Sequence, residues 1–189
     1  WQDLDLNSID QHPTRCPDKE TSNKMTAWIE QMKAERDSTG GVIHCVVTGL
    51  EIGLGEPIFG KVQARLGEAL FSLNAVKGLE FGSGFQSVNM RGSEHNDVWQ
   101  KDSTLKSNRA GGILGGITTG QALNFRIAFK PTATIGKAQT ALNTEDEAIS
   151  LEAQGRHDPC VVPRAVPIVD ALTAFVLADL RLENRTRRP

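Results

Sequence analysis

Hydrophobic and polar positions along the chain follow two periods, one typical of helices and one of strands. Over residues 18–36 and 61–73, apolar side chains recur at three- and four-residue spacing, which predicts two helices that each bury one face. Residues 123–129 alternate between apolar and polar side chains, which predicts a strand that packs on one face and presents Arg126 on the other. The β-branched run at 42–47 predicts a buried strand.

Weaker signals lie between these elements. Short strands are expected at 79–81 and 85–90, and another at 149–151. Residues 1–17 are polar and contain two prolines, which predicts an irregular lead-in. Residues 91–109 are polar and charged, so we expect a long, mobile loop there.

The last element is almost wholly apolar. From 165 to 180, polar side chains interrupt the run only at Asp170, Thr173 and Asp179, and two prolines at 163 and 167 suit a helix start. A helix that is apolar on all sides must be covered on all sides, and a position between two sheets is the simplest way to cover it. The pattern therefore predicts an α+β fold in which helices form an inner layer.

Composition and charge exclude several classes of function. Hydrophobic residues make up 39% and charged residues 23% of the 189-residue chain, as in an ordinary globular domain. The net charge of −2 provides no basic field for nucleic acid or an anionic membrane, and no apolar run reaches the roughly 18 residues that span a bilayer. The three cysteines form no C-x-x-C pair and the four histidines are scattered, so we expect no metal centre.

Two segments have the residue types that bind anions. The glycine pairs at 111–112 and 115–116 would let backbone N–H groups approach a ligand, although they could equally serve a tight backbone crossing. In Lys130-Pro131-Thr132-Ala133-Thr134, an ammonium and two hydroxyls could hold a phosphate, or the segment could be a solvated strand end.

Two further positions could contribute to a site. Arg156 suits a phosphate or carboxylate, and Asp158 could act as a base or fix that arginine, although a structural ion pair at a helix entrance would explain both. Asn74 could hydrogen-bond a ring, whereas Lys77 beside it is explained by the dipole of the helix that ends there.

The motifs together resemble the chorismate synthases, in which they occur in the same order. The resemblance extends from about residue 16 to the last helix. It rests on seven short motifs: Asp37-Ser38-Thr39-Gly40-Gly41, Gly53-Leu54-Gly55-Glu56-Pro57, Ser72-Leu73-Asn74-Ala75-Val76-Lys77-Gly78, Arg91-Gly92-Ser93, Asn108-Arg109-Ala110-Gly111-Gly112-Ile113-Leu114-Gly115-Gly116-Ile117, Lys130-Pro131-Thr132 and Arg156-His157-Asp158-Pro159-Cys160.

The resemblance implies a reaction, a cofactor and roles for residues. Family members eliminate phosphate from 5-enolpyruvylshikimate-3-phosphate to give chorismate, a step of aromatic amino acid biosynthesis that needs reduced FMN. By resemblance, Asn74, Ala75 and Gly115 contact the flavin, and 130–134 (Lys130, Pro131, Thr132, Ala133 and Thr134) holds its phosphate end. Arg156 would lie where flavin and substrate meet, and Asp158 near the flavin ring would manage a proton.

The resemblance also implies an architecture and a boundary. The family fold is a β-α-β sandwich, assembled as a homotetramer in the cytoplasm, or in the plastid if the source is a plant. The family signatures Gly-Glu-Ser-His-Gly and Ser-Ala-Arg-Glu-Thr do not occur here. We therefore expect 1–189 to be the C-terminal portion of the enzyme, inactive without the rest. Two other functions remain open, a non-catalytic module that binds FMN or another anion, and an oligomerisation domain.

Overall fold

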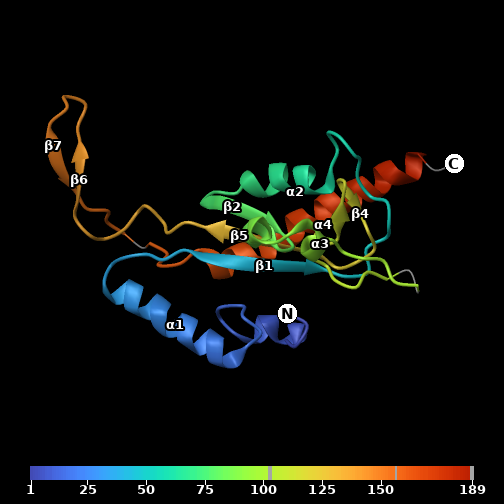
Figure 1. Ribbon diagram of the computed structural model, residues 1–189. Helices are drawn as coiled ribbons and strands as arrows, with labels where there is room; N and C mark the ends of the chain where they lie inside the picture. Colours follow the sequence, from blue (N-terminus) through green and yellow to red (C-terminus); the bar gives the residue numbers. More distant parts are fainter. Residues whose placement is uncertain (102–103, 156, 188–189) are drawn as a thin grey trace. The chain divides into compact units, whose positions relative to one another are not determined.

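The computed structural model describes residues 1–101, 104–155 and 157–187 (Figure 1). The chain forms two compact units. The first comprises Trp1–Gly41 and Phe129–Val166, and the second comprises Val42–Ala128 and Pro167–Pro189. Among the described residues, no helix is long and apolar enough to cross a membrane.

The second unit is built on a three-stranded sheet. Its strands are β1 (Gly41–Val47), β5 (Leu123–Phe129) and β2 (Val76–Phe81), in the order β1-β5-β2. Two helices run along this sheet, α2 (Val62–Phe71) and the second-unit part of α4 (Val162–Arg187) (Figure 1). The core consists of apolar side chains from all of these elements, including Ile43, Cys45, Val62, Leu66, Leu70, Leu123, Phe125, Ile127, Val169, Leu177 and Leu180. The α+β class predicted from the sequence is confirmed.

The central strand β5 has the predicted alternation. Its odd-numbered residues are buried and its even-numbered residues half-buried. The ring of Phe125 packs against that of Phe81 with centroids 5.6 Å apart. On the other face, Arg126 forms an ion pair of 2.7 Å with Glu80 of β2. The half-exposed face is therefore organised by charge pairing between strands.

The first unit begins with a short 3-10 helix, η1 (Leu6–Gln11), inside the lead-in that was expected to be irregular. The predicted helix over 18–36 is α1 (Lys19–Ala34), and its N-cap is Asp18, whose carboxylate accepts a hydrogen bond from the backbone of Thr21 at 2.7 Å. On its apolar face Met32 is buried, whereas Met25 and Trp28 are exposed, so the prediction that this helix buries one face is wrong for most of its length.

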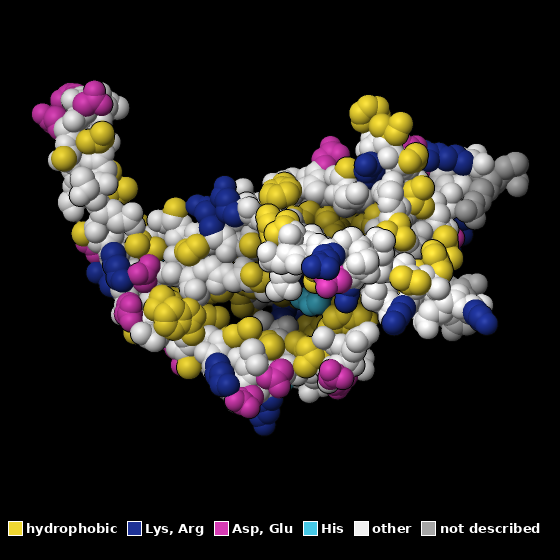
Figure 2. Space-filling view, viewed as in Figure 1, with side chains coloured by type: hydrophobic (Ala, Val, Ile, Leu, Met, Phe, Trp, Pro, Cys, Tyr) yellow, Lys and Arg dark blue, Asp and Glu magenta, His cyan; other side chains and the backbone are white. Residues whose placement is uncertain are grey.

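A hairpin of β6 (Gln139–Leu142) and β7 (Ala148–Leu151) follows in the first unit, so the expected strand at 149–151 exists and has a partner that was not expected. The turn between the two strands carries Glu145, Asp146 and Glu147, and acidic side chains gather at that tip in Figure 2.

Two expectations were wrong. Residues 85–90 form a 3-10 helix, η2 (Gly84–Asn89), instead of a strand. Gly82 and Gly84 both adopt positive φ, so the chain turns at the end of β2, and Glu80 then accepts a hydrogen bond from the backbone of Phe85 at 3.0 Å. In α4, Pro167 lies inside the helix and not at its start, because the helix begins at Val162.

The polar stretch 91–109 contains a one-turn helix, α3 (Gly92–His95). The glycine-rich residues that follow form a small antiparallel pair, β3 (Ile113–Leu114) and β4 (Ile117–Thr118). Neither strand was expected from the sequence, since each is only two residues long and is set by the glycine turn between them.

Candidate functional site

Three motifs that lie far apart in the sequence meet in the first unit. The hydroxyl of Ser38 donates to the backbone oxygen of Thr132 at 2.7 Å. The hydroxyl of Thr132 donates in turn to the backbone oxygen of Asp158 at 3.1 Å. The backbone N–H of Thr39 donates to the oxygen of Pro159 at 2.8 Å. Contacts from residues 38–39 and 158–159 thus hold the segment 130–134 in place.

In the motif at residues 37–41, Gly40 has a structural role. A Cβ built on Gly40 would collide with the backbone oxygen of Phe129 and lie 3.1 Å from the backbone of Lys130 and Pro131. Because these are backbone atoms, they cannot move aside as a flexible side chain would. Only glycine lets the two segments run against each other, so Gly40 fixes the path of the chain into 130–134.

Two side chains of 130–134, those of Lys130 and Thr134, remain open to a ligand. Lys130 is exposed, and it has no acidic partner among the described residues. Thr134 lines a cavity of about 480 Å³ together with Arg36 and His157. An ammonium and a hydroxyl on a backbone that is fixed by its neighbours can bind a phosphate without prior rearrangement.

Two ion pairs stand at the wall of this cavity, and the sequence did not indicate them. Arg36 pairs with Glu152 from the end of the hairpin. Lys137 pairs with Asp37 at 2.6 Å, and this ammonium holds the pKa of the Asp37 carboxyl below its usual value. Each pair joins residues that are about a hundred positions apart, so no local pattern could reveal it.

Asp158 has a partner on α4. One carboxylate oxygen of Asp158 accepts from the guanidinium of Arg164 at 2.7 Å. The structure therefore has an ion pair at the helix entrance, formed with Arg164, and the role of Asp158 as a base stays a prediction. Arg156, the other residue of that motif, lies outside the described residues.

The predicted flavin contacts of the second unit lie where α2 leads into β2. Asn74 is exposed, and its amide makes no hydrogen bond with the described residues. Ala75 has φ of 71°, a left-handed conformation that is strained for any residue with a Cβ. Strain of this kind often accompanies ligand sites.

The four glycines at 111–116 divide into two groups. Side chains on three of them would meet the backbone of neighbouring segments: Gly111 would strike Gly82, Gly112 would lie 2.7 Å from the oxygen of Ala122, and Gly116 would lie 2.6 Å from the oxygen of Glu56. Gly115 differs, because a Cβ there would meet nothing within 4 Å. Packing explains three of the glycines, whereas Gly115 is required by its φ of 60° in the turn between β3 and β4 and leaves open space beside the backbone.

Gly115 and Asn74 lie at opposite ends of α2. The backbone oxygen of Gly116 accepts from the N–H of Val62, the first residue of the helix, at 2.9 Å. Asn74 follows the last residue of the helix by three positions. The 10 residues of α2 span about 15 Å at 1.5 Å per residue, and Figure 1 shows β4 and the start of β2 near different ends of the helix.

Asp97 and Asn108 hold the backbone that leads into the glycines. The carboxylate of Asp97 accepts from Ser107 Oγ at 2.6 Å and from the backbone N–H groups of Arg109 at 2.8 Å and Ala110 at 2.9 Å. The amide of Asn108 accepts from Gly112 N at 2.6 Å and donates to the oxygen of Ala122 at 2.7 Å. Sequence reasoning missed both residues, although an Asp and an Asn before a glycine run are typical of side chains that bind backbone groups.

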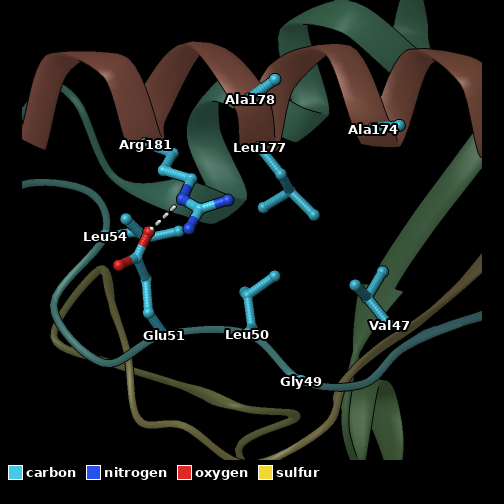
Figure 3. Close-up of a pocket in the computed structure, with 9 residues that line it drawn as sticks. All are labelled: Val47, Gly49, Leu50, Glu51, Leu54, Ala174, Leu177, Ala178 and Arg181. Atoms are coloured by element: carbon cyan, nitrogen blue, oxygen red, sulfur yellow. Dashed lines mark ion pairs between the residues drawn. The ribbon is translucent and has the colours of Figure 1, made fainter.

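A second cavity, of about 340 Å³, lies in the second unit between the loop after β1 and α4 (Figure 3). Its walls are mainly apolar, with Leu50 and Leu177 pointing inward, and Glu51 and Arg181 close one side with an ion pair of 2.8 Å. None of the residues predicted from the sequence lines this cavity.

Comparison with known proteins connects these features to one family. The family model described as chorismate synthase matches residues 3–182. The chorismate synthase of Christiangramia forsetii is 47% identical over the whole chain, and that of Porphyromonas gingivalis is 52% identical over 95% of the chain. A structure titled "Crystal Structure of Chorismate Synthase" superposes with a TM-score of 0.75 at 28% identity over 94% of the chain.

The chain spans about half the length of these relatives. It covers 53% of the Christiangramia forsetii protein, 50% of the Porphyromonas gingivalis protein and 47% of the superposed structure. The similarity therefore extends over nearly all of this chain and over half of each relative.

Proposed function

The chain belongs to the chorismate synthase family, and from that membership we propose that it is the C-terminal half of the enzyme that eliminates phosphate from 5-enolpyruvylshikimate-3-phosphate to give chorismate. The motifs found here are those that the family carries in its second half. The whole reaction then requires the first half as well, which we expect to supply the catalytic histidines and much of the grip on the substrate.

The observation that carries the proposal is the meeting of three family motifs around 130–134. Lys130 and Thr134 are presented on a backbone held by Ser38 and Asp158. The open position of Gly115 and the strained Ala75 supply two further places where a planar ring can approach the backbone closely. The donors of the first unit suit the anionic tail of a flavin, and the openings of the second unit suit its ring.

Reduced FMN supplies the electron-rich centre that this non-redox elimination needs. In our proposal, residues 130–134 bind the phosphate of the cofactor through Lys130 and the hydroxyl of Thr134, while the hydroxyl of Thr132, which donates to Asp158, holds the segment in place. Asn74 hydrogen-bonds the ring or ribityl chain. Arg156 would bind where cofactor and substrate meet.

Asp158 would take up the proton that leaves with the phosphate. Its ion pair with Arg164 orients the side chain, and a carboxylate is a group that can accept a proton.

Asn74 and Gly115 lie at opposite ends of α2, and two arrangements satisfy this geometry. One flavin lies lengthwise along the helix, or the homotetramer of the family brings Gly115 of one copy to the flavin of another. The alternative that the glycines serve only the fold accounts for Gly111, Gly112 and Gly116, whose Cβ atoms would strike the backbone, and for Gly115 through its φ of 60°. The flavin proposal adds a use for the open space beside Gly115.

We also propose that α4 is an inner layer of a β-α-β sandwich. Ile168, Phe175 and Leu182 recur every seven residues on α4 and are 48%, 78% and 60% exposed within this chain. Large apolar side chains in such a row need a cover, and the other half of the family fold would provide it.

Flavin titration tests the cofactor site. The chain is complemented with the first half of a family relative, and FMN binding is followed by fluorescence. We expect Asn74→Ala and Lys130→Ala to weaken binding at least tenfold, whereas Lys19→Ala, at an exposed lysine of α1, leaves it unchanged. Equal affinities for all of these proteins would rule out the proposed site.

A further inference from the structure

Arg109 stands apart from the other arginines of the chain. Among the described residues, seven arginines have an acidic partner: Arg15, Arg36, Arg65, Arg126, Arg164, Arg181 and Arg187. Arg91, Arg109 and Arg185 have none, and Arg91 and Arg185 are exposed. Arg109 is the one described arginine that is both half-buried and without a carboxylate.

The backbone of Arg109 is fixed on both sides. Its N–H donates to Asp97 at 2.8 Å, and its oxygen accepts from the N–H of Ser83 at 2.7 Å. Gly82 before Ser83 has φ of 54° and leaves no room for a Cβ beside that oxygen. The side chain therefore starts from a rigid position, which lowers the conformational entropy lost on binding.

Asp97, which binds the backbone of Arg109, is committed to other groups. The carboxylate oxygens of Asp97 accept hydrogen bonds from the Ser107 hydroxyl and from the backbone N–H groups of Arg109 and Ala110. Within the described part of the chain, Asp97 forms no ion pair with an arginine. Partial burial alone would raise the pKa of Asp97, but these hydrogen bonds outweigh it and lower the pKa. Asp97 thus orients the loop without neutralising the guanidinium of Arg109.

The guanidinium of Arg109 offers a planar set of N–H donors that matches a phosphate or a carboxylate, and no carboxylate among the described residues occupies it. A ligand that carries such an anionic group would supply the missing partner. We propose that Arg109 binds an anionic group, a phosphate or carboxylate, of a ligand of the proposed enzyme, with Asp97 as the residue that positions it. This inference rests on the proposed function, and the anion belongs either to the substrate ester or to the tail of the flavin.

Kinetics of the complemented enzyme test the proposal and separate the two sources. Arg109→Gln removes the charge, and Arg185→Gln is the control because Arg185 is exposed and also lacks an acidic partner. If the anion is on the substrate, Arg109→Gln raises KM for the ester at least tenfold and leaves the Kd of FMN unchanged. If it is the flavin phosphate, the Kd of FMN rises at least tenfold and that of riboflavin does not.

Inorganic phosphate is a further probe. It should compete with the ester or with FMN in the wild type, and it should compete less well in Arg109→Gln. Arg109→Lys keeps the charge and should restore part of the affinity. Unchanged KM for the ester and unchanged Kd of FMN in Arg109→Gln would overturn the inference. Loss of the melting transition in both Arg109→Gln and Arg109→Lys would also overturn it, because Arg109 would then be needed for folding. A wild type that binds FMN but releases no phosphate from the ester would instead refute the proposed function.

Discussion

The glycines at 115 and 116 are adjacent, but the structure predicts opposite consequences when each is replaced by alanine. Gly116→Ala would place a Cβ 2.5 Å from Lys61 Cγ and 2.6 Å from the backbone oxygen of Glu56. Gly115→Ala would place one in open space. Both positions have positive φ, 60° at Gly115 and 96° at Gly116, so both variants also bear backbone strain.

The magnitudes follow from these contacts. In Gly115→Ala, left-handed strain of about 1–2 kcal/mol is offset by about 0.4–1 kcal/mol from the stiffer unfolded chain, so the free energy of unfolding falls by about 1 kcal/mol. Gly116→Ala adds overpacking of about 1–3 kcal/mol, because Glu56 contributes a backbone atom that cannot move away easily. We expect it to lose about 2–4 kcal/mol in total.

Flavin affinity should fall more in Gly115→Ala than in Gly116→Ala, although Gly116→Ala loses more stability. A methyl group at Gly115 would stand between the backbone and the ring, and overpacking of about 1–3 kcal/mol corresponds to a loss of roughly 5- to 150-fold in affinity. Thermal unfolding gives the stabilities, and titration of the complemented enzyme with FMN gives the affinities. Wild-type flavin affinity in Gly115→Ala would refute the role assigned to Gly115.

Four other predictions follow from the contacts of the second unit. Leu66→Ala should lower the free energy of unfolding by about 2–5 kcal/mol in urea melts, because Leu66 is fully buried, whereas Phe71→Ala at the exposed end of α2 should lower it far less. The lowered pKa of Asp97 stabilises the fold above the ordinary carboxyl pKa of about 3.9, and that stability is lost as pH falls through the lowered value. Asp97→Asn should therefore make the free energy of unfolding fall less steeply at acidic pH. An unchanged dependence on acidic pH would contradict this. Burial raises the pKa of Cys45 to about 11, so at pH 8 only about one thiol in a thousand is ionised and Cys45 should be the last cysteine that iodoacetamide labels, by mass spectrometry of tryptic peptides. Phe175→Ser should reduce binding of a hydrophobic dye to the isolated chain, because Phe175 is the most exposed apolar side chain of α4, and equal dye fluorescence would count against an uncovered helix face.

The sequence predicted the elements whose periodicity is long. The helices α1 and α2 and the strand β5 each contain enough residues for one face to be recognised, and all three lie where the pattern placed them. The 3-10 helix η2 was mistaken for a strand because Phe85 and Val88 are apolar although both are exposed. Whether an apolar side chain is buried depends on the whole fold, so the local pattern could not show that this segment is a 3-10 helix.

For the candidate site, the sequence indicates residue types better than it indicates contacts. Lys130, Thr134 and the glycines are candidates by residue type, because anion binding needs donors and close backbone approach. The contacts that fix them, from Ser38 to Thr132 and from Asp97 to Ala110, join residues separated by 94 and 13 positions. Such contacts depend on how the chain folds back on itself, so only the structure could reveal them.

The most direct measurement is the amount of chorismate and phosphate formed when this chain, the first half of a family relative, the substrate ester and reduced FMN are combined without oxygen. We predict that both products appear in equal amounts, that neither half forms them alone, and that oxidised FMN does not replace the reduced form. A pair that assembles and binds flavin but forms no chorismate would contradict the proposal that this chain is half of the lyase.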